Sequence, residues 1–187
     1  VPGPRYTSYP TVPEWSESFG SDEYAHALAR ASARPDEPLS VYVHVPFCRE
    51  LCTYCGCNVI VSRDPARADR YLDWLAREIA LVADRLGHRR TITRLHLGGG
   101  TPTFLSEAQL ERLWAMVAQS FRFAPDAEAA IEIDPVVTSD AQLATLRRLG
   151  FSRLSMGVQD LDPDVQRAVR RLQSYEDTRA KIEAARE

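Results

Sequence analysis

The stretch Phe47-Cys-Arg-Glu-Leu-Cys-Thr-Tyr-Cys-Gly-Cys-Asn58 contains all four cysteines of the chain, which are Cys48, Cys52, Cys55 and Cys57. Thiolates are soft ligands, and several of them on one short loop can converge on a single metal centre. Structural zinc sites usually pair one cysteine knuckle with a second knuckle farther along the chain, and this sequence has no second one. Four cysteines within ten positions also suit a metal better than two disulfide bridges. The loop therefore predicts a metal centre, with an iron–sulfur cluster favoured and zinc as the alternative.

A cubane iron–sulfur cluster normally takes a thiolate on each of its irons. The spacing C-x3-C-x2-C would leave one iron without a protein ligand and open to a substrate or cofactor. Together with the aromatic Tyr54 before the third cysteine, this loop resembles that of the radical S-adenosylmethionine (SAM) superfamily. The resemblance implies that the open iron binds the amino and carboxylate groups of SAM and delivers the electron that cleaves it.

Composition limits the class of protein and its partners. A chain of 187 residues with 44% hydrophobic content can bury the core of one domain. Its formal net charge of −3 gives no reason to expect nucleic acid or an anionic membrane as a partner. No apolar run reaches the roughly 18–20 residues of a membrane span, and no basic-then-apolar leader opens the chain. Cysteines confined to one cluster fit a reducing cytoplasm, so we expect a cytoplasmic protein.

Strand-like and helix-like segments alternate along most of the chain. Apolar runs at 39–45, 92–97, 128–133 and 153–158 predict buried strands. Capping residues, prolines and glycines predict helices over 64–86, 106–121 and 139–150, with two more that begin at 162 and 175. Such short, regular alternation implies right-handed crossovers and a parallel sheet. An open Rossmann-type sheet and a (β/α) barrel both satisfy this pattern.

The positions of the unusual residues decide between these two folds. The cysteine loop follows the first predicted strand and Gly98-Gly-Gly100 follows the second, while Glu132 ends the third and Gln159 the fourth. In a barrel the active site is built from loops at the C-terminal ends of the strands. We therefore predict an α/β fold in which about four βα units form a curved, partial (β/α) barrel of the radical SAM type.

The N-terminal residues have a different character. The stretch from Gly3 to Thr11 is polar, aromatic and interrupted by prolines, which predicts an extended arm, and an alanine-rich helix follows over 21–34. We therefore assign 1–38 to an arm and helix and 39–187 to the N-terminal part of the barrel. Because the chain starts at Val1 rather than methionine and stops at Glu187 inside a helical pattern, we expect it to be an excerpt of something longer. The radical SAM resemblance implies that the remaining strands and a C-terminal region lie outside it.

Polar groups at the predicted rim are candidates for ligand binding. The glycine run lacks the pattern of a phosphate loop, but its exposed backbone can approach an amino-acid group closely, and a plain tight turn is the alternative. Glu132 and Gln159 suit the hydroxyl groups of a ribose. A solvent-facing strand position would also explain Glu132.

The basic residues near the rim divide into two groups. Of Arg167, Arg170 and Arg171, one could turn inward and pair a carboxylate bidentately, although a solvated helix face is the default for such a run. His44 and His96 lie within strand patterns, and we interpret both as structural.

Six further motifs extend over almost the whole chain. They are Arg5-Tyr-Thr-Ser-Tyr-Pro-Thr11, Tyr42-Val-His-Val-Pro-Phe-Cys48, Cys55-Gly-Cys-Asn58, Gly98-Gly-Gly-Thr-Pro-Thr103, Ile131-Glu-Ile-Asp-Pro135 and Arg153-Leu-Ser-Met-Gly-Val-Gln-Asp160. Together they resemble the oxygen-independent coproporphyrinogen III oxidase family. The resemblance implies oxidative decarboxylation of two propionates of coproporphyrinogen III to the vinyl groups of protoporphyrinogen IX. In that reaction a 5′-deoxyadenosyl radical removes a hydrogen from the carbon β to the carboxylate, and carbon dioxide and one electron are lost.

The same resemblance implies a set of site residues and partners. Cys48, Cys52 and Cys55 would hold a [4Fe–4S] cluster, and Cys57 would not bind iron. Two SAM molecules would bind side by side, at the positions that match the family's contacts: Tyr42, Tyr54, Gly99, Gly100, Thr101, Glu132, Gln159 and Arg171. A reducing donor such as flavodoxin or ferredoxin would supply the electron to a monomer.

Two alternatives to the oxidase come from different functional classes. The haem-chaperone branch of the same family keeps three cysteines, but it typically lacks both the fourth cysteine with its asparagine and the Tyr-Thr-Ser-Tyr-Pro arm, which this chain has. A zinc-stabilised binding module without chemistry would explain the cysteines. It would not explain why the glycines, Glu132 and Gln159 share one predicted rim with them.

Overall fold

Four parallel strands form the main sheet of the protein. Their order across the sheet is β1 (Leu39–Val45), β4 (Thr91–Gly99), β5 (Arg122–Ile133) and β6 (Arg153–Met156). The computed structural model describes residue 14 and residues 16–186. Within this part of the chain each strand of the sheet pairs with the one that precedes it, so the sheet grows in one direction.

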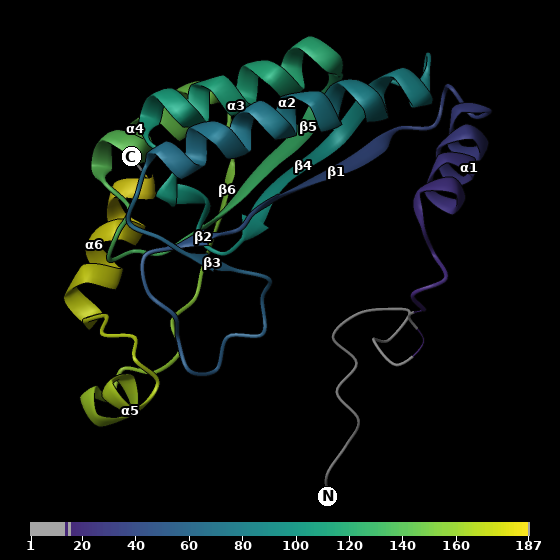
Figure 1. Cartoon of the computed structure of the whole chain (residues 1–187). Coiled ribbons are helices and arrows are strands. Elements are labelled where there is room, and N and C mark those ends of the chain that lie inside the picture. The colour runs from purple at the N-terminus through teal and green to yellow at the C-terminus, as the bar shows by residue number, and fades with distance from the viewer. Residues whose placement is uncertain (1–13, 15, 187) are drawn as a thin grey trace, which may run out of the picture.

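The helices that connect these strands lie on one face of the sheet. Figure 1 shows α2 (Ala66–Leu86), α3 (Glu107–Ser120) and α4 (Asp140–Leu149) side by side across it. A doubly wound sheet reverses its strand order and carries helices on both faces. Sequential order with helices on one face is the arrangement of a (β/α) barrel. The predicted partial barrel is therefore confirmed over the Rossmann-type alternative.

The predicted helix starts arise from side chains that satisfy unpaired backbone groups. The hydroxyl of Ser106 accepts a hydrogen bond from the Gln109 backbone at 3.3 Å, and the Gln109 carboxamide accepts one from the Ser106 backbone at 3.0 Å. Ser139 and Gln142 form the same capping box at the start of α4. The αL backbone of Gly150, with φ 94°, ends that helix. These predicted boundaries are confirmed.

Three strand boundaries differ from the predictions for reasons of pairing. β4 continues to Gly99, two residues beyond the predicted end, because its backbone still pairs with β1 through the register Val45 with Gly99. β5 begins at Arg122 rather than 128, because this residue extends the pairing with the start of β4. β6 ends at Met156, before the loop that carries Gln159.

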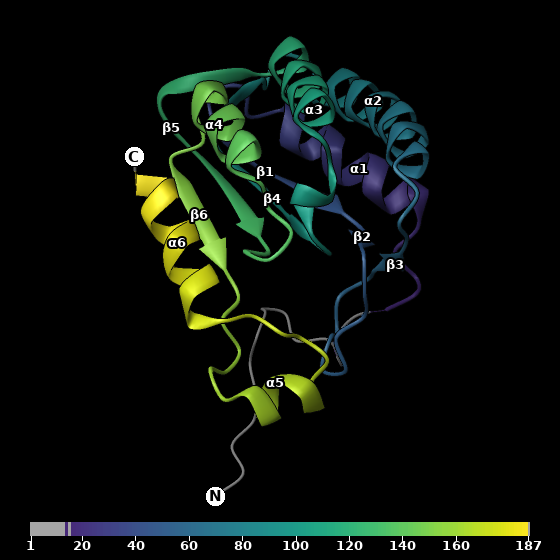
Figure 2. The same ribbon diagram turned by 90° about the vertical axis from the view of Figure 1, so that its left-hand side faces the viewer.

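The structure contains short elements, at the two ends of the cysteine loop and after the glycine run, that the sequence did not predict. β2 (Phe47–Cys48) and β3 (Ile60–Val61) form a separate parallel pair, and η2 (Pro102–Phe104) follows the glycine run. Figure 2 places α5 (Pro163–Ala168) beyond the end of β6, and α6 (Tyr175–Arg186) alongside that strand. The motif at 5–11 lies outside the described residues, and the division of the chain at residue 38 stays a prediction.

The hydrophobic core lies between the sheet and the helices. Leu95 and Ile131 of the strands are 1% and 0% exposed, and Leu72 and Leu113 of the helices are buried equally well. The other face of the sheet is polar and carries Tyr42, Arg94, His96 and Glu132. In the described part of the chain, no helix is long and apolar enough to cross a membrane.

A buried arginine ties the first helix to this core. The Arg89 guanidinium donates to the backbone carbonyls of Glu37 at 2.9 Å, Ala31 at 3.1 Å and Pro38 at 3.2 Å. These carbonyls lie at the end of α1 (Ser21–Ser32) and in the linker to β1. Arg89 is the residue that fixes the path of the chain into the sheet.

We expect Arg89→Ala to lower the free energy of unfolding by about 2–4 kcal/mol, because several carbonyls lose a charged donor. Arg34→Ala is the matched control, since Arg34 reaches the same Glu37 only through an exposed ion pair at 3.0 Å. Arg34→Ala is expected to lower the free energy of unfolding by about 0.5 kcal/mol or less. Urea unfolding followed by circular dichroism measures both values, and equal losses would show that Arg89 has no special role.

Candidate functional site

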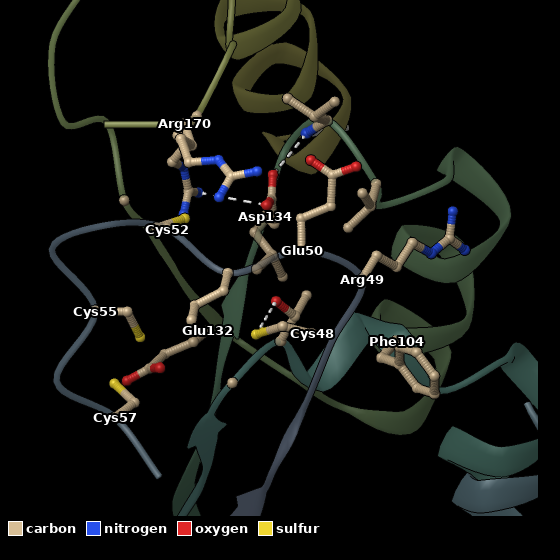
Figure 3. A pocket seen from close by; sticks show the side chains of 18 of the residues that line it. Cys48, Arg49, Glu50, Cys52, Cys55, Cys57, Phe104, Glu132, Asp134 and Arg170 are labelled. Atoms are coloured by element: carbon tan, nitrogen blue, oxygen red, sulfur yellow. Dashed lines mark hydrogen bonds and ion pairs between the residues drawn. The ribbon is translucent and has the colours of Figure 1, made fainter. Parts of the chain in front are cut away.

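A cavity of about 1270 Å³ opens at the C-terminal ends of the four parallel strands. Every residue predicted to hold the cluster or SAM lines it except Tyr42. Figure 3 shows the side chains of Cys48, Cys55 and Glu132 around this space, with Asp134 on the far wall. The fold thus brings together residues that are more than 120 positions apart in the sequence, from Cys48 to Arg171.

Both ends of the cysteine loop are fixed by backbone hydrogen bonds. The amide of Ile60 donates to the Pro46 carbonyl at 2.6 Å, and the amide of Ser62 donates to the Cys48 carbonyl at 2.9 Å. The ring of His44 lies 2.7 Å from the Asn58 carbonyl through Nε2. His44 is therefore structural, as interpreted from the sequence, and it anchors the end of the loop.

The glycine turn packs directly against the start of the cysteine loop. The amide of Gly100 donates to the Val45 carbonyl at 2.9 Å, and the amide of Thr101 donates to the Phe47 carbonyl at 2.8 Å. A Cβ at Gly100 would lie 2.7 Å from the Phe47 carbonyl oxygen and 3.0 Å from Cys48 Sγ. Only glycine fits this close approach without displacing the first predicted iron ligand.

The cysteine side chains are free thiols that face the cavity. Cys48, Cys52 and Cys55 are partly buried, and Cys57 is exposed. Burial raises the pKa of the Cys48 thiol, which the hydrogen bond to Thr101 at 3.5 Å opposes. Burial and the neighbouring Cys55 raise the pKa of Cys57. The Cys48 thiol therefore favours its protonated form, and a metal that binds it must displace the proton.

The chemistry of the donors bears on which metal group the cavity could hold. Cys48, Cys52 and Cys55 line one cavity. Thiolates are the ligands that an iron–sulfur cubane takes, one on each of its irons. Three of them would leave one iron open to a further ligand, so the residues present fit a [4Fe–4S] cluster.

Glu132 bridges two strands at the cavity wall. Its carboxylate accepts from the Gly99 amide at 3.3 Å and lies 3.2 Å from Nε2 of His96. Tyr42 stacks on His96 with ring centroids 5.8 Å apart. Tyr42 is exposed, and it contacts His44 and His96 without lining the cavity. His96, interpreted as structural, turns out to contact a predicted ligand-binding residue.

Arg167, Arg170 and Arg171 all line the cavity, and Arg171 is the partly buried one of the three. Its side chain is 18% exposed, and Nη2 lies 3.7 Å from the carboxylate of Asp134, through one nitrogen rather than bidentately. Burial lowers the pKa of Arg171, but Asp134 and the hydroxyl of Tyr54 outweigh it, so the net shift is upward. A Cβ on Gly157 would lie 2.8 Å from the Gln159 carboxamide and 3.8 Å from Arg171, so these two side chains are neighbours.

Asp134 is a cavity residue that sequence reasoning missed. Its place in Asp134-Pro135 indicated only the end of a strand. The structure shows that its carboxylate accepts from the Val136 amide at 3.0 Å while it faces Arg171. An acidic residue directly after a buried parallel strand was the available signal, because that position lies on the rim.

Comparison with known proteins identifies the superfamily. Residues 42–187 match the model of the Radical SAM superfamily. The chain belongs to the radical SAM superfamily. The family implies a [4Fe–4S] cluster and SAM, and the three thiols beside a side-chain-free glycine turn fit both groups.

Relatives of this radical SAM chain agree with the resemblance drawn from its motifs. It is 50% identical over 185 residues to the oxygen-independent coproporphyrinogen III oxidase of Escherichia coli (strain K12), covering 99% of this chain and 40% of that one. The enzyme of the same name from Pseudomonas aeruginosa is 46% identical over 186 residues, with 98% and 40% covered.

A solved structure also superposes on the radical SAM chain. It is coproporphyrinogen III oxidase from Escherichia coli, described as a radical SAM enzyme, with a TM-score of 0.87 and 48% identity. The match covers 97% of this chain and 41% of that one. The predicted resemblance is confirmed, and the chain spans about 40% of the length of these relatives.

We expect Cys48→Ala, Cys52→Ala and Cys55→Ala each to abolish cluster assembly, because two thiolates do not retain a cubane. Cys57→Ala should keep its iron, since we assign this exposed thiol no bond to the cluster. Iron and sulfide analysis with the visible absorption spectrum, after anaerobic reconstitution, measures both. Equal loss of iron from Cys57→Ala and Cys52→Ala would contradict the assignment of three ligands.

The glycine turn generates a second prediction. Gly100→Ala should reduce cluster loading severalfold, because the new methyl group would push against Phe47 and the Cys48 sulfur. Gly56→Ala is the control within the cysteine loop, since a Cβ there would meet nothing within 4 Å. The iron content per chain measures cluster loading in both variants. Full loading of Gly100→Ala would show that the close contact at Gly100 does not position Cys48.

Proposed function

We propose that this chain is the cluster- and SAM-binding part of an oxygen-independent coproporphyrinogen III oxidase. Its reaction is the oxidative decarboxylation of two propionates of coproporphyrinogen III to the vinyl groups of protoporphyrinogen IX, in haem biosynthesis. The observation that carries the proposal is the single cavity that gathers Cys48, Cys52 and Cys55 with the glycine turn, Glu132 and Arg171. Relatives of that name at up to 50% identity support the choice of substrate.

The residues of the cavity have separate roles in this proposal. Cys48, Cys52 and Cys55 hold the cluster, and the backbone at Gly99 and Gly100 receives the amino-acid portion of SAM. Arg171 faces a carboxylate as a cation, because guanidinium groups bind carboxylates with directed hydrogen bonds. When bound, the cluster would supply the electron that cleaves SAM to methionine and a 5′-deoxyadenosyl radical. That radical would take a hydrogen atom from the propionate, which would then lose carbon dioxide and pass one electron to an acceptor to form the vinyl group.

The size of the cavity supports binding of more than one small molecule. Pockets for a drug-sized ligand measure about 300–1000 Å³, and this one holds about 1270 Å³. We propose that it binds two SAM molecules side by side, with Tyr54, Thr101, Glu132, Gln159 and Arg171 shared between them. Tyr42, which is exposed and stacks on His96 beside Glu132, is a further proposed SAM contact.

The proposed partners follow from this chemistry. The substrate is coproporphyrinogen III, and a low-potential carrier such as flavodoxin or ferredoxin supplies the electron to a monomeric enzyme. The thiols must stay reduced to bind iron, which supports a reducing compartment such as the cytoplasm as the proposed location.

The test is anaerobic turnover of the native protein with SAM, coproporphyrinogen III and a reductant. We expect release of carbon dioxide and formation of 5′-deoxyadenosine, both lost in Cys52→Ala, which cannot hold the cluster. Carbon dioxide release is the deciding measurement, because SAM cleavage alone does not require the propionate. Deoxyadenosine without a decarboxylated product, together with tight haem binding, would indicate the haem-chaperone branch. Zinc in place of iron and sulfide would indicate the non-catalytic module.

A further inference from the structure

Arg171 is held at the cavity wall by a buried glutamine. Nε of Arg171 donates to the carboxamide oxygen of Gln173 at 3.3 Å, and Gln173 is only 4% exposed. The nitrogen of the same carboxamide donates to the hydroxyl oxygen of Thr178 at 2.8 Å. Gln173 therefore connects the guanidinium to α6.

Thr178 determines which end of this carboxamide faces Arg171. Its hydroxyl hydrogen is used on the Ser174 carbonyl, 2.9 Å away, so its oxygen can only accept from Gln173. The Gln173 nitrogen must then point to Thr178 and its oxygen to Arg171. In the reverse orientation the Gln173 nitrogen and Arg171 Nε would face each other as two donors. The Gln173 oxygen and the Thr178 oxygen would then face each other as two acceptors. The amide thus presents an acceptor to Nε and leaves the terminal nitrogens of Arg171 toward the cavity.

A second buried glutamine fixes the backbone of Gln173 itself. Gln166, 6% exposed, donates to the carbonyls of Asp160 at 2.7 Å and Gln173 at 2.6 Å, and it accepts from the Gln173 amide at 3.0 Å. This side chain closes residues 160–173 into one loop around α5.

The backbone turn at Arg170 completes this loop. Arg170 has φ 56°, in the left-handed region that bulky residues rarely adopt. The turn brings the Arg171 amide to 2.9 Å from the Gln166 carbonyl and reverses the chain at the end of α5. A strained residue of this kind persists only when its surroundings fix it, as the two glutamines do here.

We propose that Gln173, fixed by Gln166 and Thr178, is a positioning residue that orients Arg171 toward the carboxylate of a bound ligand. The inference rests on the proposed function only in taking SAM as that ligand. Gln173 lies outside the residues that line the cavity, so it acts through Arg171 and not by contact. Removing it should leave the guanidinium beside Asp134 but without the hydrogen bond that fixes Nε.

The test is a titration of the reconstituted native protein with SAM in a calorimeter. Gln173→Met keeps the length of the side chain and removes both its donor and its acceptor, while Thr178 keeps its bond to Ser174. We expect the Kd for SAM to rise about tenfold, the size of one lost hydrogen bond to a charged group. In an Arg171→Ala background, the same substitution should have no further effect, because the group that it positions is gone.

The control is Gln109→Met on α3. Gln109 is also a buried carboxamide, with hydrogen bonds to Asp69 at 2.8 Å and to the Ser106 amide at 3.0 Å, and it does not line the cavity. Its loss should lower the melting temperature and leave the Kd for SAM unchanged.

The outcomes separate the positioning role of Gln173 from the proposed function of the chain. A wild-type Kd in Gln173→Met, or an equal tenfold loss in the Arg171→Ala background, would overturn the positioning role and leave the proposed function intact. Wild-type protein that binds no SAM at all would overturn the proposed function and this inference together.

Discussion

The backbone of Gly100 lies so close to Phe47 that no side chain fits between them. A Cβ there would come within 2.7 Å of the Phe47 carbonyl oxygen and 3.0 Å of the Cys48 sulfur. This contact joins the end of β4 to the start of the cysteine loop, and two backbone hydrogen bonds secure it. Because the glycine turn and the first thiol occupy one wall, a group bound to that thiol would lie beside the glycine backbone and the Thr101 hydroxyl. The position of the first thiol therefore depends on this close approach.

The order of the strands determines which residues form the other walls of the cavity. Parallel strands in sequential order place all their carboxyl ends at one edge, so each connection adds one wall. β5 contributes Glu132, the position after its end contributes Asp134, and the loop after β6 contributes Gln159. The apolar side chains of these strands face the helices, which leaves the polar face for ligand chemistry. Because side chains alternate between the two faces of a strand, one face of the sheet packs against the helices and the other carries polar groups.

Local signals account for what the sequence could predict. The capping box at Ser106, the stop at Gly150 and the apolar run 39–45 each depend on neighbouring residues, and the structure has all three. Contacts between distant residues left no such signal. The β2–β3 pair is only two residues long in each strand, too short for alternation to show. The role of Asp134 depends on Arg171, which follows it in the chain only after two helices and a strand, α4, β6 and α5.

The middle of the cysteine loop shows most clearly why such contacts matter. Thr53 stands between the second and third cysteines, and its amide donates to the Val169 carbonyl at 3.2 Å while its hydroxyl donates to the Ala168 carbonyl at 3.4 Å. These carbonyls end α5, where helices leave acceptors unsatisfied. The loop is therefore fixed at both ends by β-pairing and in the middle by a segment 115 residues farther along the chain. Since the same segment carries Arg171, the thiols and the guanidinium share one support. A shift of α5 would change the geometry of the metal ligands and of the carboxylate-binding group together, which neither motif alone reveals.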